Sequence, residues 1–162
     1  MDDCKLCASL QTASPLWSDG LWHLRPIDPP WGVAGWLLLI SQRHCPGPAH
    51  FTAEEERTFG SVLARCSRAL ERATGALRIY TAALGESQHH LHVHLVPRYA
   101  SMPLGATGWN VFDLARAAAA GEISPADPLA CAHVHALVAD ALARRADIRD
   151  VPEEPARRRP RA

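Results

Sequence analysis

The sequence has no hydrophobic run long enough to cross a membrane. Its longest apolar stretch covers only residues 33–40, whereas a membrane-spanning helix needs roughly 20 such residues. Residues 1–5 carry two acidic side chains where a secretory signal would have a basic start. We therefore expect a cytoplasmic protein that does not associate with membranes.

An excess of charge of either sign is also missing, because 17 basic side chains balance 17 acidic ones. A neutral chain has no overall field that attracts nucleic acid, so we do not expect nucleic acid as a partner, and any anionic ligand needs a local site. Lysine is almost absent: Lys5 is the only one, and every other basic residue is an arginine. Arginine suits bidentate contacts to phosphate, but genome composition explains this bias equally well.

The length of 162 residues suits one domain and is too short for two. Within it we expect a core over residues 1–100 and a helical extension of the same domain over residues 101–150. Residues 151–162 are rich in Pro, Glu and Arg and have almost nothing to bury, so we expect a disordered tail.

Hydrophobic patterns and turn residues predict an α+β fold with an antiparallel sheet. The expected strands cover residues 21–25, 35–40, 77–84 and 90–96. Proline lacks the N–H that a central strand needs, so Pro97 is expected to end the last of them.

Three helices are expected from start signals and periodicity. Thr52 and Glu55 form a capping box, which predicts the start of a long helix over residues 53–73. Asn110 and Asp127 mark the starts of two later helices, which end near residues 120 and 145.

Three histidines alternate with apolar residues in the expected strand 90–96. Successive side chains of a strand point to opposite faces, so His90, His92 and His94 share one face at spacings of about 6.5 to 7 Å. This spacing suits contacts to different oxygens of one phosphate, or coordination of one metal by two of them. The alternative is an edge strand with solvated histidines, which would leave their proton chemistry and ligand capacity unused.

Residues 90–98, His-Leu-His-Val-His-Leu-Val-Pro-Arg, resemble the signature of the histidine triad (HIT) superfamily, and the final Pro-Arg resembles its dinucleoside polyphosphate hydrolase branch. Residues 35–44 resemble the family's glycine-led strand with the turn that follows, and residues 51–55 resemble its helix start. The resemblance implies a HIT-like fold with a five-stranded antiparallel sheet and flanking helices, usually as a homodimer that joins two sheets.

The resemblance also implies a nucleotide hydrolase or nucleotidyl transferase. It would act at the α-phosphate of a nucleoside phosphate, such as a dinucleoside polyphosphate or a nucleoside phosphoramidate. His92 would attack phosphorus and form a covalent nucleotidyl-histidine, while His94 would stabilise charge on the phosphoryl oxygens. Ser87 matches the family's hydroxyl near the leaving group, and His90 completes the triad. No metal is required for the chemical step.

Three residues depart from the family pattern. Glu86 stands where many members have glutamine, Trp36 where a histidine is usual, and Asp28 where an asparagine contacts the ribose. Asp28 can still accept hydrogen bonds from ribose hydroxyls, whereas Glu86 would repel a polyphosphate unless protonated or paired. The expected nucleotide-binding residues are Asp28, Glu86, Ser87, His92 and His94. The departures keep open an alternative, a zinc-stabilised nucleotide-binding or interaction module without turnover.

Cys4 and Cys7 form a Cys-x-x-Cys pair, which indicates metal or redox chemistry. Some HIT proteins, and the related galactose phosphate uridylyltransferases, combine such a pair with two histidines that map to His44 and His90. The resemblance therefore implies structural zinc on these four residues, and free thiols are the alternative. A third hypothesis, a catalytic metal held by the triad itself, predicts that a chelator abolishes activity.

Overall fold

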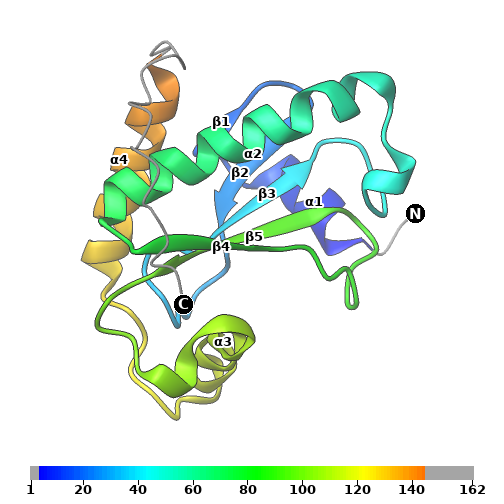
Figure 1. Ribbon diagram of the computed structural model, residues 1–162. Helices are drawn as coiled ribbons and strands as arrows, with labels where there is room; N and C mark the ends of the chain where they lie inside the picture. Colours follow the sequence, from blue (N-terminus) through cyan, green and yellow to red (C-terminus); the bar gives the residue numbers. More distant parts are fainter. Residues whose placement is uncertain (1–3, 145–162) are drawn as a thin grey trace, which may run out of the picture.

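A computed structural model describes residues 4–144 of the chain, so the expected tail over residues 151–162 lies outside the described part. The elements run in the order α1 (Lys5–Thr12), β1 (Trp17–Ser18), β2 (Trp22–Pro26), β3 (Leu37–Ser41), η1 (Pro48–His50), α2 (Ala53–Thr74), β4 (Arg78–Ala82), β5 (His92–Arg98), η2 (Leu104–Ala106), η3 (Gly108–Asn110), α3 (Val111–Ala120) and α4 (Pro128–Ala143) (Figure 1). No helix within residues 4–144 is long and apolar enough to span a bilayer.

The five strands form one sheet in the order β1-β2-β3-β5-β4, and each neighbouring pair is antiparallel. The expected α+β fold with a five-stranded antiparallel sheet is therefore confirmed. Strand β5 lies between β3 and β4, and His94 sits opposite Leu38 on one side and Ala82 on the other. The strand that carries His92 and His94 is therefore paired with a neighbouring strand on each side.

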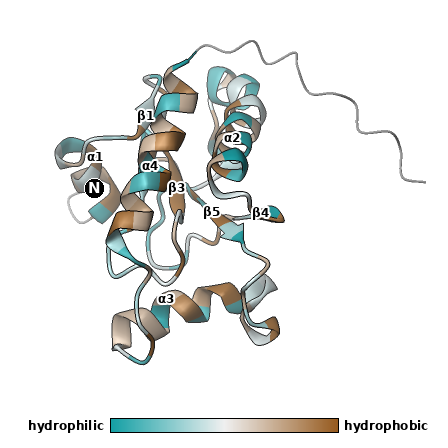
Figure 2. Cartoon of the chain, turned by 90° about the vertical axis from the view of Figure 1, so that its left-hand side faces the viewer, coloured by the Kyte–Doolittle hydropathy of each residue, from teal (hydrophilic) through white to brown (hydrophobic). Residues whose placement is uncertain are grey.

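Alternation along the strands divides the sheet into two faces. One face packs against α2 and α4 and forms the main core, which includes Trp22, Leu24, Leu37, Leu39, Leu91, Val93, Leu95, Leu70 and Val138. The opposite face carries His92 and His94, and α1 and α3 lie over it, packing against Leu38 and Val96 respectively. Figure 2 shows α1 and α2 on opposite sides of the strands. The histidines therefore face the two smaller helices.

Helix α2 confirms the capping-box prediction. The Thr52 side chain accepts from the Glu55 backbone N–H, and the Glu55 carboxylate accepts from the Thr52 N–H, so two of the unpaired donors at the helix start are satisfied. Gly75 in the left-handed conformation ends the helix. Helices α3 and α4 also begin near the expected residues, with Asp127 capping α4.

Two details of the expected histidine strand are wrong. Strand β5 begins at His92, so His90 lies before it, and the strand continues through Pro97 to Arg98. Pro97 is tolerated because β3 pairs with β5 only as far as Leu95. The side of Pro97 that lacks an N–H faces the chain before the first residue of β3, Leu37, so no ladder hydrogen bond is lost.

Candidate active site and metal site

His92 is held in one tautomer by the backbone. Its Nδ1 lies 2.7 Å from the carbonyl oxygen of His90, so Nδ1 carries the proton and donates. The lone pair of the imidazole is therefore on Nε2, the atom on the far side of the ring. A half-buried imidazole whose Nε2 has no partner among the described hydrogen bonds is equipped to act as a nucleophile.

Trp36 holds His94 in the opposite tautomer, with the proton on Nε2. The indole Nε1–H donates to Nδ1 of His94 over 3.1 Å, and because an indole nitrogen can only donate, that Nδ1 carries no proton. The neutral ring then has its single proton on Nε2, where it can donate to an anionic oxygen. Burial, and secondarily the neighbouring His92, lowers the pKa of His94 to about 4, so the ring is neutral near pH 7.

His90 serves a different purpose from its two neighbours. It is fully buried, and its Nε2 lies 2.7 Å from the carbonyl of Ser41, to which it donates. This leaves Nδ1 as a lone pair, 3.5 Å from Sγ of Cys4 and 3.4 Å from Sγ of Cys7. The structure therefore brings His90 to the two cysteines and directs a ligand atom at them.

His44 completes the cluster, with its Nδ1 3.3 Å from Sγ of Cys7. The four ligand atoms of Cys4, Cys7, His44 and His90 all lie within 4.8 Å of one another. Around a tetrahedral zinc ion with ordinary bond lengths, neighbouring sulfur and nitrogen atoms are about 3.6 Å apart. The separations and the donor set, two thiols and two imidazoles, fit such an ion. No second cluster of this kind occurs in the described part of the chain.

The loop between β3 and α2 positions His44. Arg43 forms an ion pair with the buried carboxylate of Glu55 at 2.7 Å and donates to the carbonyl of His50. The backbone N–H of Leu91 donates to the carbonyl of Cys45 over 2.6 Å, so this loop is also tied to the segment that carries His90. Glu55 of the α2 capping box thus fixes the loop that carries His44 as well as the helix start.

The expected nucleotide contacts are less closely assembled. Asp28 follows β2 and is 80% exposed, and it forms an ion pair with the nearly buried Arg25. Glu86 and Ser87 are exposed in the loop between β4 and β5, and none of the described side-chain hydrogen bonds joins them to the triad. The same loop contributes residues 83–85 to a small cavity of about 80 Å³ that His92 also lines.

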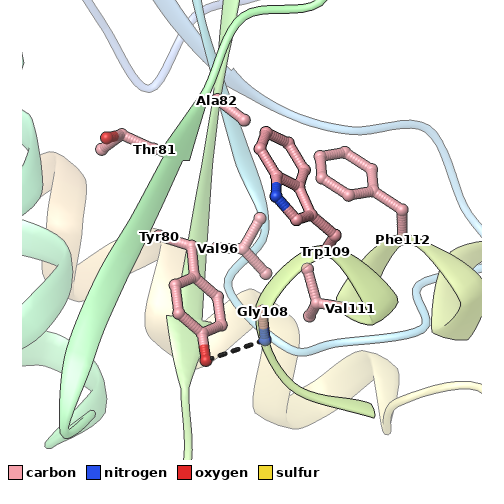
Figure 3. Close-up of a pocket in the computed structure, with 8 residues that line it drawn as sticks. All are labelled: Tyr80, Thr81, Ala82, Val96, Gly108, Trp109, Val111 and Phe112. Carbon is pink, nitrogen blue, oxygen red and sulfur yellow. Dashed lines mark hydrogen bonds between the residues drawn. The ribbon is translucent and has the colours of Figure 1, made fainter.

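A larger cavity, of about 230 Å³, lies on the histidine face beneath η3 and α3, and the sequence reasoning missed it (Figure 3). Its walls include Tyr80, Ala82, Val96, Trp109, Val111 and Phe112. The Phe112 ring also contacts the rings of His94 and Trp36, with centroids 5.1 and 5.2 Å away. No spacing motif marks these residues, because η3 and α3 follow β4 by about 30 positions.

Comparison with known proteins agrees with this geometry. The sequence model of the HIT domain matches residues 22–101. No curated protein matches the chain.

Solved structures of histidine triad proteins share the fold. A hypothetical histidine triad nucleotide-binding protein from Sulfolobus tokodaii is 14% identical, with a TM-score of 0.62 over 86% of this chain and 92% of that one. A HIT protein from Sinorhizobium meliloti is 23% identical, with a TM-score of 0.62 over 83% and 93%. A zinc-bound histidine triad family protein from Mycobacterium smegmatis is 21% identical, with a TM-score of 0.60 over 87% and 94%.

Proposed function

This chain belongs to the histidine triad family through its HIT domain, residues 22–101, and from that premise we propose that it is a nucleotide hydrolase or nucleotidyl transferase acting at the α-phosphate of a nucleoside phosphate. The observation that carries the proposal is the hydrogen bond from Nδ1 of His92 to the carbonyl of His90. It leaves the Nε2 lone pair of His92 free to attack phosphorus.

In the first step of the proposed reaction, Nε2 of His92 forms a bond to the α-phosphorus. The bond from phosphorus to the leaving atom breaks, and its electron pair departs with that atom, which takes a proton from water when it is an amine nitrogen. Nε2–H of His94 donates to a phosphoryl oxygen and offsets the charge that develops there. Water or another acceptor then forms a bond to the phosphorus and gives its proton to solvent. The bond from phosphorus to Nε2 breaks, and its electron pair returns to Nε2 of His92.

Nucleotide binding is assigned to groups on both sides of the triad. Asp28, on the β2 side, accepts hydrogen bonds from the ribose hydroxyls, and the ion pair with Arg25 supports its orientation. Ser87 donates to the bridging oxygen or leaving group from the β4–β5 loop, beside Glu86. Because both loop side chains are exposed, this assignment requires the loop to close over the substrate.

Cys4, Cys7, His44 and His90 would hold a structural zinc ion. The ion would cross-link α1 to the segment before β5 and supply no chemistry to the reacting phosphate. The zinc-bound relative from Mycobacterium smegmatis supports this choice of metal. A cytoplasmic location and a homodimer stay predictions.

The exposed positions of Glu86 and Ser87 also favour a second candidate, a zinc-stabilised nucleotide-binding module without turnover. The two candidates differ in one observable: only the enzyme forms a covalent adduct on His92. Nucleotide affinity without an adduct would select the module.

The test is turnover of adenosine and guanosine phosphoramidates and dinucleoside polyphosphates by wild type beside His92→Asn, with metal content recorded on the same samples. Rapid quenching at neutral pH and intact-protein mass spectrometry would detect a nucleotidyl adduct, because the histidine–phosphorus bond is acid-labile. Turnover and an adduct in wild type, both lost in folded His92→Asn, support the proposal. Turnover that survives in His92→Asn, or that a chelator abolishes while the fold is retained, contradicts it.

A further inference from the structure

The cavity beneath η3 and α3 is adjacent to the reacting centre. Ala82 and Val96 line it, and both lie beside His94: Ala82 is its partner across the β4–β5 ladder, and Val96 is two residues along the same strand face. Phe112 lines the cavity as well, and its ring contacts the His94 ring, with centroids 5.1 Å apart. A group attached to a phosphate held at His94 can therefore reach this cavity past Ala82 and Val96.

The cavity lies on the β4 side of His94, whereas Asp28 lies on the β2 side, beyond β3. In the proposed function the nucleoside occupies the Asp28 side. In-line attack by His92 expels the leaving group on the side of phosphorus opposite Nε2. Because the cavity lies beyond His94 as seen from His92, and the nucleoside occupies the Asp28 side, the β4 side remains for the leaving group. The cavity therefore lies where the leaving group of the substrate would be.

The lining is apolar and aromatic. None of the residues around the cavity carries a charge at neutral pH. The hydroxyl oxygen of Tyr80 accepts from the backbone N–H of Gly108 over 3.1 Å, which leaves its O–H and the indole N–H of Trp109 as side-chain donors of the lining. Figure 3 shows the side chain of Thr81 directed away from the other labelled side chains, and Val96 between the rings of Tyr80 and Trp109. A polyphosphate or a nucleobase edge has more polar atoms than these two donors can satisfy, so most of them would stay unpaired here.

The volume of the cavity limits the size of the group that it can hold. At about 230 Å³ it is smaller than the roughly 300–1,000 Å³ that encloses a drug-sized ligand. It suits one ring system. Trp109 lines the cavity and is 70% exposed, so its ring is available for a ligand ring to stack on.

Half of the residues that line the cavity lie outside the HIT domain: Gly108, Trp109, Val111 and Phe112. Gly108, at a φ of +63°, makes the turn that places Trp109, and its N–H anchors the turn to Tyr80. Helix α3 is seated on the β2–β3 loop at Gly32, where an added Cβ would lie 2.3 Å from the Leu114 carbonyl oxygen. These two contacts add to the packing of α3 against Trp36 and Val96, so the extension is fixed to the domain and the cavity is preformed.

We propose that this cavity is a leaving-group site that selects nucleoside phosphates whose leaving group carries an uncharged aromatic or apolar moiety, in preference to a second nucleotide. The proposal rests on the proposed function. It narrows the substrate class from any nucleoside phosphate to one with a phosphorus–nitrogen or phosphorus–oxygen bond to a small ring-bearing group.

The experiment compares two phosphoramidates in each of the adenosine and guanosine series, one with an unsubstituted amino group and one with a benzylamino group, together with diadenosine tetraphosphate. Wild type is expected to favour the benzyl compound in kcat/KM. Trp109→Ala is expected to lower the benzyl-to-unsubstituted ratio about tenfold, since a stacked ring is lost. The matched control is Leu104→Ala, because Leu104 is 87% exposed in the same extension but does not line the cavity, and it should keep the wild-type ratio.

A second readout does not depend on turnover. The uncharged probe 4-fluorobenzyl alcohol is titrated with protein and followed by ¹⁹F line broadening, which is expected in wild type and Leu104→Ala and reduced in Trp109→Ala. Probe binding that depends on Trp109, with no turnover of any compound, supports the site and overturns the proposed function. Turnover with equal ratios in wild type and Trp109→Ala and no probe binding overturns the site alone. A Trp109-dependent preference for diadenosine tetraphosphate overturns the apolar assignment.

Discussion

Replacing Trp36 by phenylalanine tests whether the indole N–H controls the reactivity of His94. Trp36 is 2% exposed, and its ring contacts Phe112 as well as His94. Phenylalanine preserves an aromatic contact, removes the donor and reduces the volume of the ring. Nδ1 of His94 then loses its partner and can take the proton, which leaves Nε2 without the hydrogen that the phosphoryl oxygen needs.

The magnitude follows from the lost hydrogen bond. A hydrogen bond of this kind contributes about 1 to 1.5 kcal/mol, which corresponds to about a tenfold preference for one tautomer. We therefore expect kcat of Trp36→Phe to fall about tenfold, while KM changes by about twofold or less, because the interaction strengthens in the transition state. An unpaired buried acceptor also costs about 1 to 3 kcal/mol of unfolding free energy.

The assay combines steady-state kinetics with ¹⁵N NMR of the histidine side chains, which separates the two neutral tautomers. Wild type should show His94 protonated on Nε2, and Trp36→Phe should show a mixture of tautomers. Trp36→His, which supplies a ring N–H at the same position, should recover part of kcat. The reasoning is refuted if Trp36→Phe keeps the Nε2 tautomer, or if kcat falls although the tautomer is unchanged.

The remaining predictions concern the metal, pH and α3. Cys7→Ser should lose bound zinc, measured by elemental analysis, and lower Tm by several degrees, because structural metal contributes to folding; unchanged metal content would contradict the assignment. The pKa of His94 is lowered to about 4, because burial favours the neutral ring. Its contribution to the free energy of unfolding is therefore complete above pH 6.5 and is lost as the pH falls towards 4, by about 3 kcal/mol at most. Urea denaturation at pH 7 and pH 5 should show that the free energy of unfolding depends less on pH in His94→Asn than in wild type. Gly32→Ala should destabilise the fold by about 1 to 3 kcal/mol through its clash with Leu114, and a loss below that range would mean that α3 shifts freely.

The parts of the fold that could be predicted from the sequence have local signals. Helix α2 has a capping box, a long apolar stripe and a glycine stop, and each signal acts within a few residues. Helix α1 escaped prediction because it is short, lacks a side-chain cap and buries only Leu6. Strand β1 has two residues, which is too few for an alternation to show.

The candidate site also contains some residues with a local sequence signal and others without one. The alternation of His90, His92 and His94 is a local pattern, and the cluster with the two cysteines and His44 followed from the resemblance to the family. The pairing of Trp36 with His94 joins residues 58 positions apart, and nothing near Trp36 in the sequence indicates its partner. The place of His90 in that cluster was also expected from the resemblance, but the Ser41 carbonyl that accepts from its ring and turns Nδ1 towards the cysteines required coordinates.

The attachment of the extension at Gly32 and Tyr80 has an evolutionary consequence. The hydrogen bonds that orient His92 and His94 come from residues within the HIT domain. The exposed wall of the adjoining cavity comes from a segment that follows this domain and packs on it through one face of α3. Mutations at the exposed surface of that segment can change which molecules fit the cavity while the hydrogen bonds that orient the two histidines stay intact. Under the proposed function, such a division allows a lineage to acquire new substrates without first losing the old chemistry.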